Sequence, residues 1–192
     1  MISNSNIKRL YSDYKSLLNL NDTTKYNIDT LDISVLLSYI VSYQDRLTNY
    51  WYNNKSNNIY LEISNQITTD IAIKVDIYKY LEIIEVIIFN AAEELCSKDD
   101  ETKEIFKKEI AIQLYLEGEN FILRIKDDGR GIEDIKKIFK LNYTTKKQQG
   151  GTGLGLAAAL KIANDLDINI SVNTKPDKGS TFYIFKGISR DD

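Results

Sequence analysis

Apolar residues recur at helical spacing in four stretches of the chain, and each stretch predicts a helix. Asp32 stands at the start of the second stretch, where its carboxylate can cap the N–H groups of a helix N-terminus. Asp76 lies near the start of the third stretch, which is long and mostly apolar. The fourth stretch begins at a run of glycines. The predicted helices cover residues 6–20, 31–54, 74–98 and 154–167, with one short helix within 130–151.

Alternating apolar and polar positions predict five strands. Two pairs of these strands are joined by the turn sequences EGEN and KPDKG, which favour hairpins. Because hairpins are interspersed with long helices, we expect an α+β fold: a two-layer sandwich with a mixed, mostly antiparallel sheet covered on one face by helices. A polar linker is expected at residues 19–30. The predicted strands cover residues 59–67, 109–117, 120–126, 168–174 and 180–188.

The composition excludes several kinds of site. The chain of 192 residues has one cysteine, Cys96, and no histidine, which excludes an internal disulfide, a Ser-His-Asp triad and any histidine-ligated metal. The net charge of −3, with Lys interleaved among Asp and Glu, favours no nucleic-acid partner. The first residues are polar, and no apolar run approaches the roughly 18 residues of a membrane helix. We therefore expect no direct membrane insertion and a cytoplasmic protein, or the cytoplasmic part of a membrane-bound one.

The glycine-rich stretch GGTGLGL, residues 150–156, is the first candidate for chemistry. It holds four of the nine glycines of the chain and runs directly into a predicted helix. Glycines let backbone amides approach a ligand, and a helix N-terminus adds N–H groups and partial positive charge. Together they predict a cradle for an anion such as phosphate. On the glycines alone, a loop that binds nothing remains equally compatible.

Three further stretches change this picture. Asp127 begins the sequence DDGRG directly after a predicted strand, so a tight turn is expected beside a carboxylate that can accept a hydrogen bond from a planar amine. Asn90 lies in an otherwise apolar helix, where a buried amide needs a partner. The sequence FKLNYTTKK, residues 139–147, places hydroxyl and ammonium groups just before the glycines. Taken singly, each stretch also fits a plain turn, a satisfied core amide or a polar loop.

The order of these four stretches resembles the ATP-binding catalytic domain of sensor histidine kinases, in the GHKL superfamily shared with DNA gyrase B, Hsp90 and MutL. The helix with its Asn is similar to the N box, DDGRGI to the first glycine box, IFKLNYTTK to the F box, and GGTGLGLAAAL to the second glycine box. The resemblance extends over residues 30–187 and implies the Bergerat-type version of the sandwich.

The resemblance implies that the cofactors are ATP and Mg²⁺. Asp127 would bind the adenine amine, while Gly129 and Gly131 shape that pocket. Asn90 would be the metal ligand, coordinating the Mg²⁺ that bridges the phosphates.

The resemblance also implies a phosphate end. Residues 132–152 would form a lid over ATP, and Lys146 would neutralise charge during phosphoryl transfer. The backbone amides of the glycine run would reach the phosphates. The implied phosphate-binding residues are Thr145, Gly151, Gly153, Leu154 and Gly155.

Two features of the predicted N-box helix depart from the family pattern. Many members carry a carboxylate or an amide one helical turn before the Asn, whereas this chain has Val86. Glu82 and Glu94 share the face of Asn90 more nearly and are the candidate catalytic carboxylates, so the identity of a general base stays open. Where many kinases carry Lys or His soon after the Asn, this chain has Glu93 followed by Glu94.

The absence of histidine leaves the phosphate acceptor outside this chain. We expect two parts: residues 1–28, an N-terminal helix and linker that is a candidate remnant of a dimerisation helix, and residues 29–192, the kinase-like domain. The expected partner is a histidine-bearing dimerisation domain or a protein of a response-regulator pathway, with a dimer formed through the N-terminal helix. The alternatives are an anti-sigma-type serine kinase and an ATP-dependent switch without kinase activity.

Overall fold

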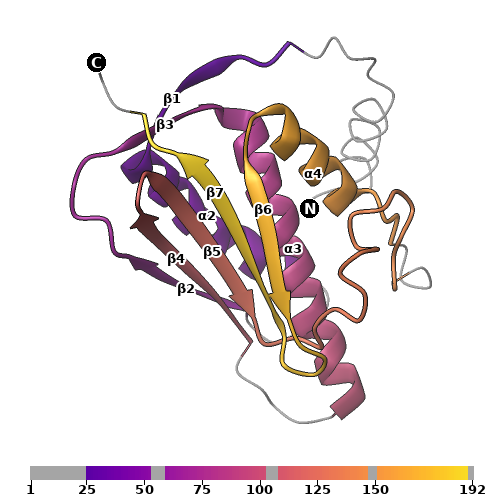
Figure 1. The fold of residues 1–192 in the computed structure, drawn as a ribbon. Coiled ribbons are helices and arrows are strands. Elements are labelled where there is room, and N and C mark those ends of the chain that lie inside the picture. The colour runs from indigo at the N-terminus through magenta and orange to yellow at the C-terminus, as the bar shows by residue number, and fades with distance from the viewer. Residues whose placement is uncertain (1–24, 53–58, 103–107, 147–150, 190–192) are drawn as a thin grey trace.

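The computed structural model describes residues 25–52, 59–102, 108–146 and 151–189, so the predicted N-terminal helix lies outside the described residues. The described chain forms three helices and seven strands (Figure 1). In chain order they are β1 (Ile28–Asp32), α2 (Ile33–Tyr52), β2 (Tyr60–Asn65), β3 (Ala72–Asp76), α3 (Ile77–Thr102), β4 (Glu109–Glu117), β5 (Asn120–Asp127), α4 (Gly155–Asp165), β6 (Asn169–Thr174) and β7 (Ser180–Gly187).

Five strands form the main sheet, in the order β2-β4-β5-β7-β6. β2 pairs with β4 in parallel, and the other three pairings are antiparallel. The helices lie on one face of this sheet, with α4 beside α3 and near β6 (Figure 1). The predicted fold class, a two-layer α/β sandwich with a mixed, mostly antiparallel sheet, is confirmed.

The core lies between the sheet and α3. Along each strand, every second side chain points toward the helices. Ile112, Ile125 and Phe182 are paired across neighbouring strands, and all three are buried. α3 is apolar around much of its circumference, because it also packs against α4. This packing places α3, the helix that carries Asn90, against both the sheet and α4.

Three sequence predictions differ from the structure. Residues 28–32, predicted as the end of the linker and the start of a helix, form β1, and residues 72–76, predicted partly as helix, form β3; the two strands pair with each other. The reason is that their pairing is made by tertiary contact, while their own alternation is too short to signal a strand. The short helix expected within residues 130–151 is absent from the described residues, where isolated turns such as Lys137 N–H to the Asp134 carbonyl stand instead.

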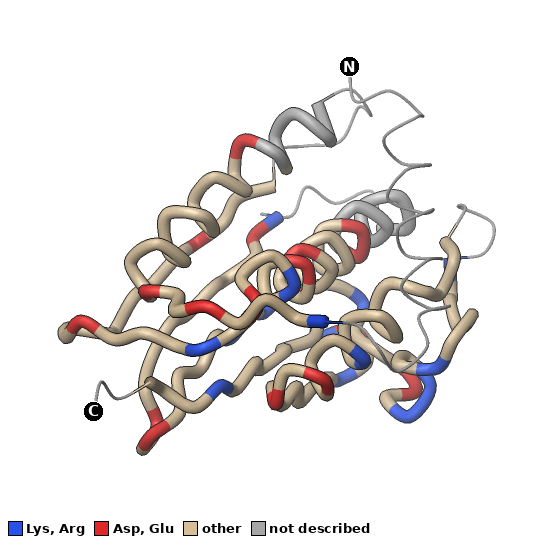
Figure 2. The backbone as a smooth tube through the Cα atoms, turned by 90° about the horizontal axis from the view of Figure 1, so that it is seen from above, with Lys and Arg blue, Asp and Glu red and all other residues tan. Residues whose placement is uncertain are grey.

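Charges of both signs are distributed along the described backbone (Figure 2). In the part of the chain that the structure describes, none of the helices combines the length and the apolar character needed to cross a bilayer.

Asp76 joins three elements through one carboxylate. It is the last residue of β3, and its Oδ1 accepts a hydrogen bond from the Lys79 N–H at 3.1 Å, which caps the first turn of α3. Its Oδ2 accepts from the Asn27 N–H at 2.9 Å, just before β1. Asp76 is only 9 % exposed. If its carboxylate were removed, both N–H donors would lose their partner in a place that water reaches poorly.

Replacing Asp76 by Ala is expected to lower the free energy of unfolding by about 2 kcal/mol, the sum of a lost helix cap and a lost charge-assisted hydrogen bond. Urea denaturation followed by circular dichroism measures this. Asp70→Ala is the matched control, because Asp70 is exposed and should change stability little. Equal stability of the two variants would contradict the role of Asp76.

Candidate functional site

A cavity of about 690 Å³ opens between α3, the chain after β5, residues 143–146 and the start of α4. It collects residues that are distant in sequence, from the middle of α3 to the turn between β6 and β7. Glu82 and Gly129 are the two predicted site residues that do not line it. Those that do are Asn90, Glu94, Asp127, Gly131, Thr145, Lys146, Gly151, Gly153, Leu154 and Gly155.

Asp127 ends β5 with its side chain only 3 % exposed. Its Oδ1 accepts a hydrogen bond from the Gly129 N–H at 2.8 Å, which places Gly129 behind the carboxylate. Burial raises the pKa of Asp127 to about 6, and nearby Glu94 adds to the rise, while the backbone N–H groups of Gly129 and Ser180 oppose it. A carboxylate kept in so apolar a place can form a strong hydrogen bond with an amine donor.

The turn between β6 and β7 fixes the chain around Asp127. Gly179 has φ of +79°, and a Cβ there would run into the carbonyl oxygen of Asp127, so the turn lies directly against the end of β5. The Thr174 hydroxyl accepts from the Ile132 N–H at 2.8 Å and donates to the Gly179 carbonyl at 3.0 Å. The carboxylate is therefore positioned by backbone contacts between segments that are about fifty residues apart, and not by the DDGRG sequence alone.

Asn90 lies on α3 and lines the cavity. Its Nδ2 donates to the Val86 carbonyl at 2.9 Å, which is the partner that a partly buried amide requires. The amide oxygen takes no part in this bond and is a hard ligand of the type Mg²⁺ prefers. Among the described residues no group of three or more His, Cys, Asp or Glu could hold a metal by itself. The donor set thus fits Mg²⁺ only when a ligand supplies further oxygens.

The glycine run packs against the segment before it and opens α4 on the cavity. Gly153 has φ of +66°, and a Cβ there would lie 2.6 Å from the Tyr143 carbonyl oxygen. Its own carbonyl accepts from the Asn142 N–H at 3.1 Å. Leu154 precedes the helix without any side-chain cap, so the first-turn N–H groups of α4 are not satisfied by a side chain. These N–H groups and the helix dipole make the start of α4 suited to an anion.

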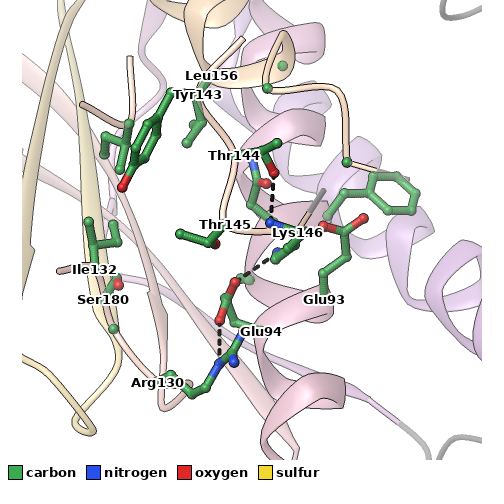
Figure 3. Close-up of a pocket in the computed structure, with 18 of the residues that line it drawn as sticks. Glu93, Glu94, Arg130, Ile132, Tyr143, Thr144, Thr145, Lys146, Leu156 and Ser180 are labelled. Atoms are coloured by element: carbon green, nitrogen blue, oxygen red, sulfur yellow. Dashed lines mark hydrogen bonds and ion pairs between the residues drawn. The ribbon is translucent and has the colours of Figure 1, made fainter. Parts of the chain in front are cut away.

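A cluster of charges lies across the cavity (Figure 3). The Lys146 ammonium group pairs with Glu93 at 2.9 Å and with Glu94 at 2.8 Å, and Arg130 Nε pairs with Glu94 at 3.2 Å. Burial lowers the pKa of Lys146, but the attraction of the two carboxylates outweighs it, and the net shift is upward. Lys146 is therefore a fully charged cation that already has two anionic partners.

Glu82 lies apart from this cluster. It pairs with Lys79 at 2.8 Å on the first turns of α3 and does not line the cavity. Eight residues separate it from Asn90, about 12 Å along a helix axis, so a shared face does not bring it to the site. Of the two candidate catalytic carboxylates, only Glu94 is near the other predicted residues.

Sequence reasoning missed several lining residues. Ser180 is the first residue of β7, directly after Gly179, and it pairs with Asp127 of β5. Tyr143 and Arg130 lie within stretches that the sequence singled out, yet their types alone did not mark them. Asp177 enters through the turn between β6 and β7, where its N–H donates to the Arg130 carbonyl at 2.6 Å. No local signal could have found Asp177, because only tertiary packing brings that turn to the site.

The part of the chain that forms the cavity matches a known protein family. Residues 75–188, more than half of the chain, match the family model described as Histidine kinase-, DNA gyrase B-, and HSP90-like ATPase. The chain belongs to this family. The matched segment runs from the end of β3 to just beyond β7, and it contains every residue of the cavity lining named above. Membership implies that the domain uses a nucleotide.

The chain is similar to sensor kinases in sequence and in structure. It is 28 % identical over 181 residues to the histidine protein kinase SaeS of Staphylococcus epidermidis, an alignment that covers 91 % of this chain and 47 % of SaeS. It is 36 % identical over 77 residues to the aerobic respiration control sensor protein ArcB of Escherichia coli, which covers 36 % of this chain and 10 % of ArcB.

Among solved structures, the histidine kinase AdeS of Acinetobacter baumannii superposes with a TM-score of 0.66 at 18 % identity, over 97 % of this chain and 79 % of AdeS. At this identity the superposition shows that the fold is shared. The chain spans less than half the length of SaeS and about a tenth of ArcB.

The pKa of Asp127 predicts how stability depends on pH. Its folded pKa of about 6 lies above the ordinary value of 3.8, so the folded state holds this proton more tightly than the unfolded chain. The resulting stabilisation is complete below pH 3.8 and is lost as the pH rises through about 6. By pH 7 the charged carboxylate costs about 3 kcal/mol relative to acidic solution.

We expect Asp127→Asn to unfold with a higher free energy than the wild type at pH 7.5 and with a similar one near pH 3, below the ordinary carboxyl pKa of 3.8. Urea titrations across this pH range measure the free energy of unfolding of both proteins. The contribution of all other titrating groups cancels in the difference between the two. A difference that stays constant with pH would contradict the raised pKa.

Proposed function

We propose that this chain is the Mg-ATP-binding catalytic domain of a histidine kinase-like protein, which transfers the γ-phosphoryl group of ATP to a histidine on a separate domain or chain. The proposal is carried by one observation: Asp127, Asn90 and the glycine run line a single cavity in a chain of the histidine kinase-like ATPase family. The site roles predicted from the sequence stay proposals, each supported by the contacts of the residue.

At the adenine end, the Asp127 carboxylate accepts a hydrogen bond from the adenine amine. The buried position supports this role, because a hydrogen bond to a charged acceptor gains strength where water is scarce. Apolar lining from Ile132, Leu156 and Phe182 suits a flat purine ring. Gly131 keeps this wall free of a Cβ where the chain passes close to Lys175.

At the phosphate end, the backbone amides at the start of α4 and Thr145 bind the phosphates, and the Asn90 oxygen holds the metal. When bound, Mg²⁺ would neutralise charge that develops on the phosphates during transfer. Lys146 contributes a further positive charge beside the same oxygens.

In the transfer step, the bond between the γ-phosphorus and the ADP oxygen breaks as a bond to an imidazole nitrogen forms, and the imidazole releases its proton. The acceptor lies outside this chain because the chain has no histidine. We further propose that residues 1–28 form or extend a dimerisation helix and that the domain works in the cytoplasm, where ATP is supplied. The partner is then a histidine-bearing dimerisation domain or a protein of a response-regulator pathway.

An ATP-dependent switch without phosphotransfer is the second candidate. Val86 lies one helical turn before Asn90 and lines the cavity with an apolar side chain, where a carboxylate would be needed to orient water. Hydrolysis of ATP is therefore expected to be slow in either case.

ATP binding is tested by calorimetric titration with Mg²⁺. We expect a micromolar to sub-millimolar dissociation constant for the wild type and a loss of at least about 1–2 kcal/mol in Asp127→Asn, the scale of a hydrogen bond to a charged group. Asp128→Asn is the matched control, because Asp128 is exposed, pairs with Lys126 and does not line the cavity. Affinity should also fall as the pH drops below about 6, since a protonated Asp127 carboxyl accepts a weaker hydrogen bond from the adenine amine than the carboxylate does. Equal losses in both variants would refute the adenine contact.

Phosphotransfer is tested with ATP labelled on its γ-phosphate and with several separately expressed histidine-bearing helical domains. The expected product is a label on the acceptor that acid removes, as phosphohistidine requires, and Asn90→Ala should abolish it. A label that survives acid would identify a serine kinase instead. Nucleotide binding without any label on any acceptor would favour the switch.

A further inference from the structure

The charges around the cavity do not suit a polyanion. Among the described residues of the lining, five carboxylates face two cations, which leaves a formal charge of −3 at neutral pH. A triphosphate therefore meets net repulsion in the very site proposed to bind it. The carboxylates are Glu93, Glu94, Asp127, Glu133 and Asp177, and the cations are Arg130 and Lys146.

Both cations are already engaged by the same acidic pair on α3. Lys146 lies between Glu93 and Glu94, at 2.9 Å and 2.8 Å, and Glu94 also binds Arg130 (Figure 3). The Lys146 side chain is 12 % exposed, so its attraction to the carboxylates is screened less than that of a surface pair. Phosphate oxygens must compete with these two carboxylates for the ammonium group.

The pair stands at the phosphate end and not elsewhere in the cavity. Glu93 and Glu94 follow Asn90 by three and four residues, hence by about one helical turn. The segment that carries Lys146 is tied to the glycine run, because the Gly151 N–H donates to the Lys146 carbonyl at 3.0 Å. Lys146 thus sits between the acidic pair and the proposed phosphate-binding amides.

We propose that Glu93 and Glu94 determine which charge form of the nucleotide this site accepts, by occupying Lys146 until a metal ion accompanies the phosphates. Metal-free triphosphate must break the ion pairs and enter a negative site. The metal complex carries less negative charge and brings a cation for the carboxylates that lose Lys146. This inference rests on the proposed nucleotide binding and assigns its selectivity to residues that the nucleotide need not touch.

The test compares the dissociation constants of ATP in excess EDTA and in saturating Mg²⁺ by calorimetry, for the wild type and for Glu93→Gln. Glu93 is the chosen position because its side chain is 44 % exposed, so Gln should fold normally, which a thermal melt checks. We expect Glu93→Gln to tighten metal-free ATP by about threefold to tenfold and Mg-ATP by less, so that the preference for the complex shrinks. Adding Lys146→Met to Glu93→Gln should abolish this gain.

Glu133→Gln is the matched control, because it removes the same charge from the same lining, whereas the ion pairs of Lys146 are with Glu93 and Glu94. It should change the preference less than twofold. The inference is overturned if Glu93→Gln leaves the preference unchanged, if Glu133→Gln changes it equally, or if Glu93→Gln weakens Mg-ATP, which would make the carboxylate a metal ligand. A wild type that binds neither form of ATP would overturn the proposed function itself.

Discussion

The burial of one carboxyl group, that of Asp127, is the constraint on which the site depends. Taking this group out of water costs free energy, and the folded chain retains it because the strands on both sides leave no alternative position. β7 pairs along the whole of β5 up to Asp127, and the turn before β7 lies against the same backbone at Gly179. A buried carboxyl group with a raised pKa, kept in place by the surrounding packing, is typical of a binding site and not of a core.

The opposite end of the cavity is governed by charge balance. The start of α4 presents N–H groups and positive dipole, while α3 presents Glu93 and Glu94. Lys146 pairs with both carboxylates, and a phosphate bound at the start of α4 would compete with them for its ammonium group. In the proposed function, adenine is recognised through shape and burial, whereas the phosphates compete with two carboxylates for one ammonium group.

The departures from the family pattern gather on one helix, at Val86, Glu93 and Glu94 of α3. The structure connects them, since an apolar residue one turn before Asn90 and an acidic pair one turn after it both alter the surroundings of the same amide, that of Asn90. The changes surround the proposed phosphate end, and the charge of Glu94 also adds to the raised pKa of Asp127. Selectivity and hydrolysis are therefore the properties in which this chain should differ from its relatives.

Local sequence determined most of the elements and the motif-bearing residues. Periodicity located the three described helices and five of the seven strands, and the glycine spacing marked the start of α4, because these signals arise within a few consecutive residues. β1 and β3 were not predicted, because each is only five residues long and is stabilised by pairing with the other, which lies forty or more residues away in the sequence. Tertiary structure alone decided that Glu82 lies outside the site, that Gly179 confines Asp127, and that Lys146 binds the acidic pair. The last two contacts join segments about fifty residues apart, and their partners are selected by packing, which no local pattern encodes.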